Sequence, residues 1–121
     1  SLRNATLSGA NLTNAVFLKA DLTGANLSNS NYITSADFTD AIMVNVNLSN
    51  SNLKGSNFTS ANLSGVNFTN ANLKDANFTN ANLTGTTGWS SANLAGVIWG
   101  NTTCPDGSNS ASDGGTCVGH L

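Results

Sequence analysis

Large apolar residues recur at every fifth position along most of the chain, and this period constrains the fold more than any other feature. The segment NFTSANLSGVNFTNANLKDANFTNANL, residues 57–83, is typical, because Asn precedes each Leu or Phe at the period of five. A helix repeats its apolar residues every three or four positions and a strand every second position, so neither explains a period of five. The repeating unit is A-(N/D)-(L/F)-(S/T)-(N/G/D), as in residues 61–65.

Each unit is predicted to be a short extended segment followed by a corner. In extended backbone, the small and the large apolar residue of a unit face one way, while the Asn and the Ser or Thr face the other. The fifth position is rich in Asn and Gly, which tolerate the positive φ of tight turns. A chain that turns the same way at every corner closes into a coil, and coils stack at the ~4.8 Å spacing of strands.

The aromatic residues indicate that four units make one coil. Every fourth central residue then stacks in one column, and one core column is aromatic throughout: Phe17, Phe38, Phe58, Phe78 and Trp99. The other columns read Leu2, Leu22, Met43, Leu63, Leu83; Leu7, Leu27, Leu48, Phe68, Trp89; and Leu12, Tyr32, Leu53, Leu73, Leu94. Three or five units per coil would scatter the aromatic residues. Two extra residues interrupt the period, and we expect one-residue bulges at corners within residues 33–35 and 86–91.

This pattern resembles the pentapeptide repeat family over residues 1–101. The resemblance implies an all-β fold, a right-handed quadrilateral β-helix that here would have about five coils. It also implies that the small and the large apolar positions of each unit point inward. We expect two parts, a β-helix over residues 1–101 and a C-terminal capping tail over residues 102–121. Five outward positions before a central residue depart from Asn or Asp: Thr6, Val16, Ile42, Gly88 and Ile98.

The tail carries the only two cysteines, Cys104 and Cys117, and we predict a disulfide between them. A disulfide indicates an oxidising compartment, so the predicted location is extracytoplasmic: periplasm, thylakoid lumen or secreted. We expect the tail to fold over the last coil and cover Trp99, because the end of a solenoid exposes core side chains and strand edges.

Two metal sites in the tail are weaker alternatives. A zinc site made from both cysteines and His120 would lack a fourth ligand. A Ca²⁺ loop around Asp106 and Asp113 would have few carboxylates. We therefore predict no metal and no cofactor.

The sequence brings no evident catalytic group together, and we predict that the protein is not an enzyme. His120 is the only histidine, and it is interpreted as a solvated residue of the tail. The aspartates of the repeat are scattered over outward and corner positions. With four Lys or Arg residues and a net charge of −2, the chain also lacks the clustered cations that nucleic acid requires. No apolar run approaches the ~20 residues of a membrane span.

Several outward residues are apolar where the repeat is usually polar. Ile33 and Ile98 are single cases, whereas two pairs could form a contact surface: Val16 with Leu18, and Ile42 with Val44. On another outward strip, Thr39, Thr59 and Thr79 are predicted to stack as a flat array, as in solenoids that bind ice.

The N-terminal coil has no comparable cap, so Leu2, Leu7, Leu12 and Phe17 would lie open there. Because Ser1 stands directly inside the repeat, we interpret the chain as processed or trimmed. Either a removed segment covered this end, or two molecules meet there as a homo-oligomer.

The leading hypothesis for the function is a non-catalytic structural or protein-interaction module with an unknown protein partner. Two alternatives remain. Some members of the family mimic DNA and interact with gyrase, but mimicry needs a strongly acidic face and this chain has six acidic residues. An ice- or surface-binding solenoid is the other alternative. The source is expected to be bacterial.

Overall fold

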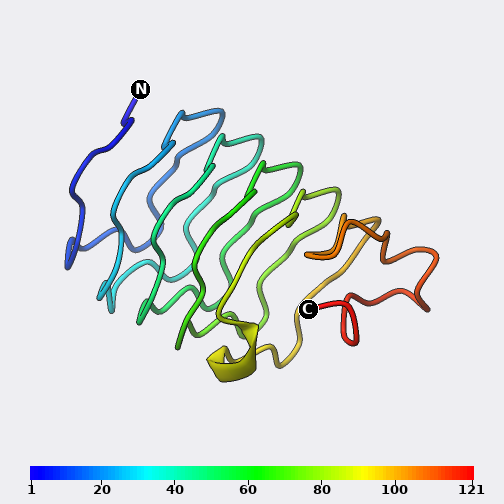
Figure 1. Ribbon diagram of the computed structural model, residues 1–121. Helices are drawn as coiled ribbons and strands as arrows, with labels where there is room; N and C mark the ends of the chain where they lie inside the picture. The colour runs from blue at the N-terminus through cyan, green and yellow to red at the C-terminus, as the bar shows by residue number, and fades with distance from the viewer.

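The computed structural model describes residues 1–121, and it confirms the right-handed quadrilateral β-helix. Figure 1 shows coils of similar size stacked along one axis, with the tail beyond the last coil. The sides of the coils are held together by single parallel bridges, such as Thr6 to Asn26 and Asn57 to Asn77, rather than by longer strands. The only helical element is a short 3₁₀ turn, η1 (Trp89–Ser91).

Each regular corner is a β-turn whose third residue has a positive φ. After Phe58, for example, the N–H of Ala61 donates to the carbonyl of Phe58 at 3.0 Å, and Ser60 between them has a φ of 58°. The same position holds Gly24, Gly65 or Gly85 in some coils and Asn50, Asn70 or Asn80 in others. Gly has no Cβ to clash in this region and Asn tolerates it, which explains the composition of the fifth position.

The side chain of the Asn or Asp before each central residue stabilises the next corner by hydrogen bonds. Asn57 Oδ1 accepts hydrogen bonds from the backbone N–H of Thr59 at 3.1 Å and from its hydroxyl at 2.6 Å. Asp21 with Thr23 repeats this arrangement. The side chain thus satisfies a backbone group that the turn leaves free, and the Asn-x-Ser/Thr triplets are a product of this geometry.

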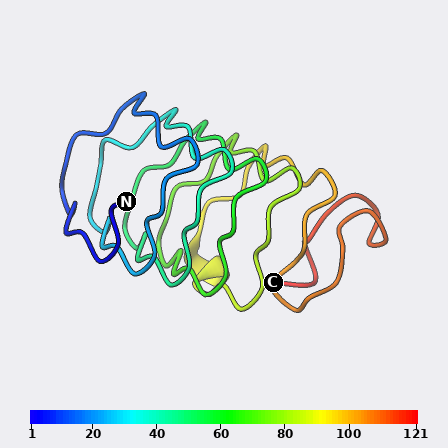
Figure 2. The same ribbon diagram turned by 90° about the horizontal axis from the view of Figure 1, so that it is seen from above.

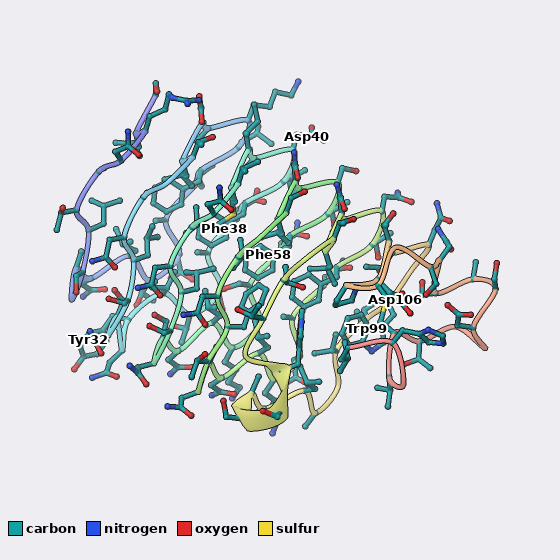
Figure 3. All side chains as sticks on the ribbon, viewed as in Figure 1. Tyr32, Phe38, Asp40, Phe58, Trp99 and Asp106 are labelled. Atoms are coloured by element: carbon teal, nitrogen blue, oxygen red, sulfur yellow. A yellow bond between two sulfur atoms is a disulfide. The ribbon has the colours of Figure 1, made fainter.

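The central residues form one continuous core, which Figure 3 shows with Phe38 and Phe58 inside the coils. The aromatic rings stack with centroid separations of 5.0 Å (Phe17–Phe38), 5.1 Å (Phe38–Phe58), 5.0 Å (Phe58–Phe78) and 5.6 Å (Phe78–Trp99). The structure thus places these five residues in one column. Phe68, from another column, meets Phe58 and Phe78 edge-on.

The first extra residue lies before Tyr32, and the prediction of a bulge within residues 33–35 is wrong. Tyr32 bridges Asn11, so it takes the outward position and is 58% exposed, whereas Ile33 is fully buried as the central residue. The prediction that Tyr32 points inward and Ile33 outward is therefore also wrong. An Ile side chain can be buried without a partner, but a buried Tyr hydroxyl needs a hydrogen bond.

The second extra residue falls within residues 86–91, where it was expected. Thr87 bridges Asn67 and takes the outward position that had been assigned to Gly88. Gly88 follows with a φ of 87°, and η1 then turns the side chain of Trp89 inward, 4.9 Å from the ring of Phe68. The extra residue thus leaves the aromatic ring in the core.

Gly88 is predicted to be the least replaceable glycine of the coils. A Cβ at Gly88 would lie 2.1 Å from the backbone nitrogen of Thr69, whereas a Cβ at Gly85 would have no neighbour within 4 Å. Both residues have positive φ, so the conformational cost is similar and the clash sets the difference. We expect Gly88→Ala to cost roughly 1–2 kcal/mol more than Gly85→Ala in urea unfolding. Equal losses would contradict this account of the bulge.

Candidate functional site

The two ends of the β-helix differ in how well their core side chains are covered. At the N-terminal end, Leu2 is 37% exposed and Leu7, Leu12 and Phe17 are only partly buried. Figure 2 shows this first coil at the end of the stack opposite the tail. At the other end, Trp89 and Trp99 are 7% and 9% exposed. The core side chains of the first coil are therefore partly accessible, as expected from the sequence.

The first coil also presents free backbone hydrogen-bonding groups. In later coils, the residue before the centre uses both groups toward the preceding coil: the N–H of Asn57 donates to the carbonyl of Ala36, and its carbonyl accepts from Phe38. The equivalent residues of the first coil, Thr6, Asn11 and Val16, form no such backbone bonds. Their N–H and C=O groups form an open edge on three sides of the coil.

The tail closes part of the opposite end. Thr103 bridges Asn82, so one side of the helix continues past residue 101. The chain then reverses, and Asn109 pairs antiparallel with Thr103. Cys104 lies above Leu83 in the core, and its disulfide to Cys117 has a Cα–Cα distance of 5.4 Å. Both cysteines are fully buried.

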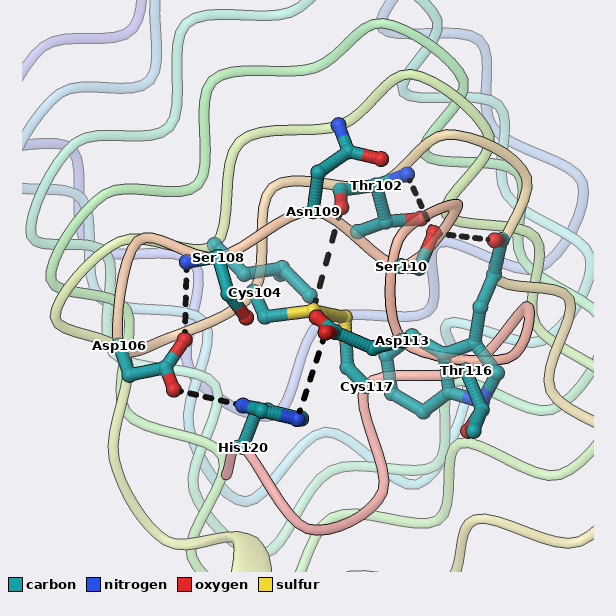
Figure 4. The surroundings of a disulfide bond; sticks show 12 residues. Thr102, Cys104, Asp106, Ser108, Asn109, Ser110, Asp113, Thr116, Cys117 and His120 are labelled. Carbon is teal, nitrogen blue, oxygen red and sulfur yellow. Dashed lines mark hydrogen bonds and ion pairs between the residues drawn. A yellow bond between two sulfur atoms is a disulfide. The ribbon is translucent and has the colours of Figure 1, made fainter.

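Ser110 attaches the tail to the last coil. Its hydroxyl donates to the carbonyl of Trp99 at 2.6 Å and accepts from the N–H of Thr102 at 2.8 Å (Figure 4). The N–H of Ser110 donates to the carbonyl of Thr102 at 2.9 Å. Ser110 is fully buried, so these bonds satisfy a hydroxyl that would otherwise destabilise the interior.

His120 lies between two carboxylates of the tail, an arrangement that the sequence did not predict. Its Nδ1 is 2.8 Å from Asp106 Oδ2, and its Nε2 is 3.6 Å from Asp113 Oδ1 (Figure 4). The hydrogen bond to Asp106 raises the pKa of His120 above its ordinary value, and nearby Asp113 contributes. The hydrogen bond from the N–H of Ser108, followed by the one from His120, lowers the pKa of Asp106 to about 2.

The outward apolar residues lie on two adjacent sides of the helix. Val16 and Leu18 belong to the first coil and are 71% and 52% exposed. Ile42 is 44% exposed and lies between Asp21 and Asn62 on the next side, with half-buried Val44 near it. The structure therefore places the two pairs on different sides, and only the first pair adjoins the open edge.

The threonine array predicted from the sequence has its hydroxyl groups occupied. The hydroxyls of Thr39, Thr59 and Thr79 each donate at 2.6 Å to the Asx side chain two residues earlier. Asn57 also donates to the hydroxyl of Thr39 at 2.9 Å. These hydroxyl protons are donated within the protein, so the array presents mainly hydrogen-bond acceptors to the solvent. A water lattice, in contrast, presents both donors and acceptors.

Asp21 is the other carboxylate whose pKa is lowered by its surroundings. The hydroxyl and N–H of Thr23, together with Arg3, stabilise its charged form and lower its pKa to about 2. Arg3 forms an ion pair with Asp21 at 3.0 Å. This pair joins the first coil to the second.

No pocket opens in the molecule, and no group of three or more His, Cys, Asp or Glu side chains is arranged to hold a metal ion. No helix has both the length and the apolar character that a membrane crossing would require. The regular surface is interrupted at the open first coil, at Val16 and Leu18, and at the tail. These three places are the candidate sites.

Comparison with known proteins identifies the family of this chain. The family model for pentapeptide repeats matches eight copies, over residues 1–31, 33–70 and 51–87. Among curated proteins, no match was found.

Solved structures of similar proteins include a pentapeptide repeat protein, Rfr23, from the cyanobacterium Cyanothece 51142. It is 41% identical over 69% of this chain and 58% of its own, with a TM-score of 0.47, so this chain spans little more than half its length. A pentapeptide repeat protein from the Arabidopsis thaliana thylakoid lumen is 29% identical over 81% of this chain and 67% of its own, with a TM-score of 0.39.

Trypsin-treated QnrB1, a plasmid-mediated fluoroquinolone resistance protein, is 20% identical over 80% of this chain and 66% of its own, with a TM-score of 0.32. The repeat seen in the sequence, the coils seen in the structure and the family match over most of residues 1–87 agree. This chain belongs to the pentapeptide repeat family.

Proposed function

We propose that this protein is a non-catalytic structural and interaction module that pairs with a second copy of itself through its open N-terminal coil. The observation that carries the proposal is the difference between the two ends. Partly buried Leu and Phe side chains and a free backbone edge occur together at the first coil. The opposite end has buried tryptophans and a tail fastened by a disulfide.

The free groups of the first coil suit a symmetric partner. In an antiparallel pair, residues directly opposite each other exchange both N–H···O bonds. Thr6, Asn11 and Val16 each have both groups free on the same edge. Two first coils related by a twofold axis can therefore complement each other, and such an interface closes as a dimer rather than a filament.

We place the pairing on the side of Val16. Val16 and Leu18 are the exposed apolar residues that adjoin the free edge. A second copy that pairs along this side would cover them as well as the free N–H and C=O of Val16. Burial of this apolar surface favours association in addition to the backbone bonds.

The test compares Val16→Pro with Val16→Thr. Proline removes the free N–H, whereas threonine keeps the N–H and the β-branched shape. A symmetric dimer would lose two hydrogen bonds, so we expect the dissociation constant of Val16→Pro to rise roughly tenfold or more above that of Val16→Thr. Sedimentation equilibrium measures it. The monomer should stay folded, because this N–H has no partner within the chain.

Two outcomes would overturn the proposal. One is a wild-type protein that stays monomeric at roughly millimolar concentration, a range that detects even weak pairing. The other is Val16→Pro with the same dissociation constant as Val16→Thr.

We further propose an extracytoplasmic location, the periplasm, a thylakoid lumen or the outside of the cell. The Cys104–Cys117 disulfide supports it, because disulfides of ordinary mesophilic proteins persist mainly in oxidising compartments. Alkylation of thiols in freshly lysed source cells tests the location, and two free thiols in the native protein would count against it.

A further inference from the structure

His120 joins two segments of the tail that follow different paths. Asp106 belongs to the turn after Cys104, where its Oδ1 accepts from the N–H of Ser108 at 2.9 Å. Asp113 lies in the turns that follow Ser110, and its N–H donates to the carbonyl of Ser110 at 3.1 Å. His120 comes after the disulfide and contacts both aspartates. His120, near the end of the tail, thus connects its first and middle parts.

The geometry favours the charged imidazolium, because Nδ1 lies at hydrogen-bond distance (2.8 Å) from Asp106 and Nε2 at ion-pair distance (3.6 Å) from Asp113. Nδ1 faces an oxygen of Asp106 and Nε2 faces an oxygen of Asp113, so both ring nitrogens point to acceptors. A neutral imidazole has one N–H and one lone pair, and only the imidazolium can donate on both sides. If the ring is neutral and keeps its bond to Asp106, the lone pair of Nε2 faces a carboxylate oxygen.

We propose that His120, Asp106 and Asp113 form a pH-sensitive latch that holds the tail closed over the last coil while His120 is protonated. Loss of the proton releases the contact with Asp113 and leaves the two carboxylates with no cation between them. The Ser110–Gly115 segment, which contains Asp113, then opens more often. The disulfide and the helix stay intact, so only the covering of the Trp99 end changes. This device does not depend on the proposed dimer at the other end.

Asp106 and Asp113 are the charged groups that act on His120, and the disulfide beside them does not titrate. The pKa of His120 is raised in the folded tail, so its contribution is complete below the ordinary His pKa and is lost as the pH rises through the folded value. The pKa of Asp106 is lowered to about 2, so its contribution is complete above the ordinary Asp pKa and is lost as the pH falls toward 2. The latch is therefore closed in mildly acidic solution and loosens as the pH rises through the raised pKa of His120.

Amide hydrogen exchange at Ser110, Asp113 and Gly115 tests the latch, because each of these N–H groups donates a hydrogen bond within the tail or to Thr102. Protection factors, which correct for the intrinsic effect of pH, are compared at about pH 5.5 and about pH 8.5, either side of the ordinary His pKa. For the wild type we expect lower protection at the higher pH. For His120→Gln, which does not titrate, we expect the same protection at both.

Asp113→Asn separates the latch from a general effect of pH. An Asn side chain can donate to the lone pair of a neutral imidazole, so this variant should keep its tail closed at the higher pH. Protection in the wild type that does not change with pH would overturn the proposal. A fall in the protection factors of His120→Gln with pH that is as large as in the wild type would overturn it too. So would a fall in the protection factors of Asp113→Asn that equals the fall in the wild type.

Discussion

Replacing Phe58 by Ala is expected to lower the free energy of unfolding by about 3–5 kcal/mol. Phe58 is fully buried, and its ring lies between those of Phe38 and Phe78 at 5.1 and 5.0 Å. Hydrogen bonds to both neighbouring coils fix the backbone around it, so the cavity cannot close by a shift of one coil alone. Urea unfolding measures the loss.

Phe17→Ala is the matched control, because Phe17 belongs to the same column but lies in the open first coil. Its ring stacks only on Phe38, and its side chain is partly buried. We expect a loss of about 1–2 kcal/mol, since less apolar area leaves water. A loss below about 1 kcal/mol for Phe58→Ala, or equal losses at the two positions, would show that the column is not a rigid core.

Replacing Cys104 and Cys117 together by Ala is expected to free the tail. The disulfide closes a loop with a sequence separation of 13 residues, and in the entropic description such a link contributes about 3 kcal/mol. Because the cost falls on the tail, we expect a separate low-temperature transition while the coils stay folded. Tryptophan fluorescence should shift to the red as water reaches Trp99, and the tail should become sensitive to protease.

Ser112→Ala is the control for this experiment, because Ser112 is an exposed residue of the same tail. It should leave the fluorescence and the protease resistance unchanged. If the double cysteine variant also kept its fluorescence and protease resistance, Ser110 and the antiparallel pairing would hold the tail without the disulfide.

The period of the sequence predicted most of the fold, because one local rule operates in every unit. Alternation gives the inward and outward positions, and the fifth residue gives the corner. The rule failed at Tyr32, where both Tyr32 and its neighbour Ile33 are large and apolar enough to be central. A position between two plausible central residues can be assigned only from contacts with the adjacent coils, such as the bridge between Asn11 and Tyr32.

The candidate sites were predictable to different degrees. The outward position of Val16 follows from the alternation of inward and outward positions in extended backbone. The contact of His120 with Asp106 and Asp113 could not be predicted, because it joins residues 14 and 7 positions apart in a segment without periodicity. The disulfide was predicted from the two cysteines, but the path of the tail also depends on the buried hydroxyl of Ser110, which has no signature in the sequence.

The register of 20 residues between successive coils restricts how the length of this protein can change. Eight of the fifteen parallel bridges join residues 20 apart, as in Asn57 to Asn77, and the other seven span one of the two extra residues and join residues 21 apart. Removal of one five-residue unit would rotate every later column by a quarter turn and place Phe rings over Leu side chains. Removal of a full coil would leave every column intact, and one added residue at a corner, as at Asn31, is absorbed locally. Insertions and deletions of whole coils or of single corner residues should therefore be tolerated. Changes of intermediate length, such as one five-residue unit, should rarely be tolerated.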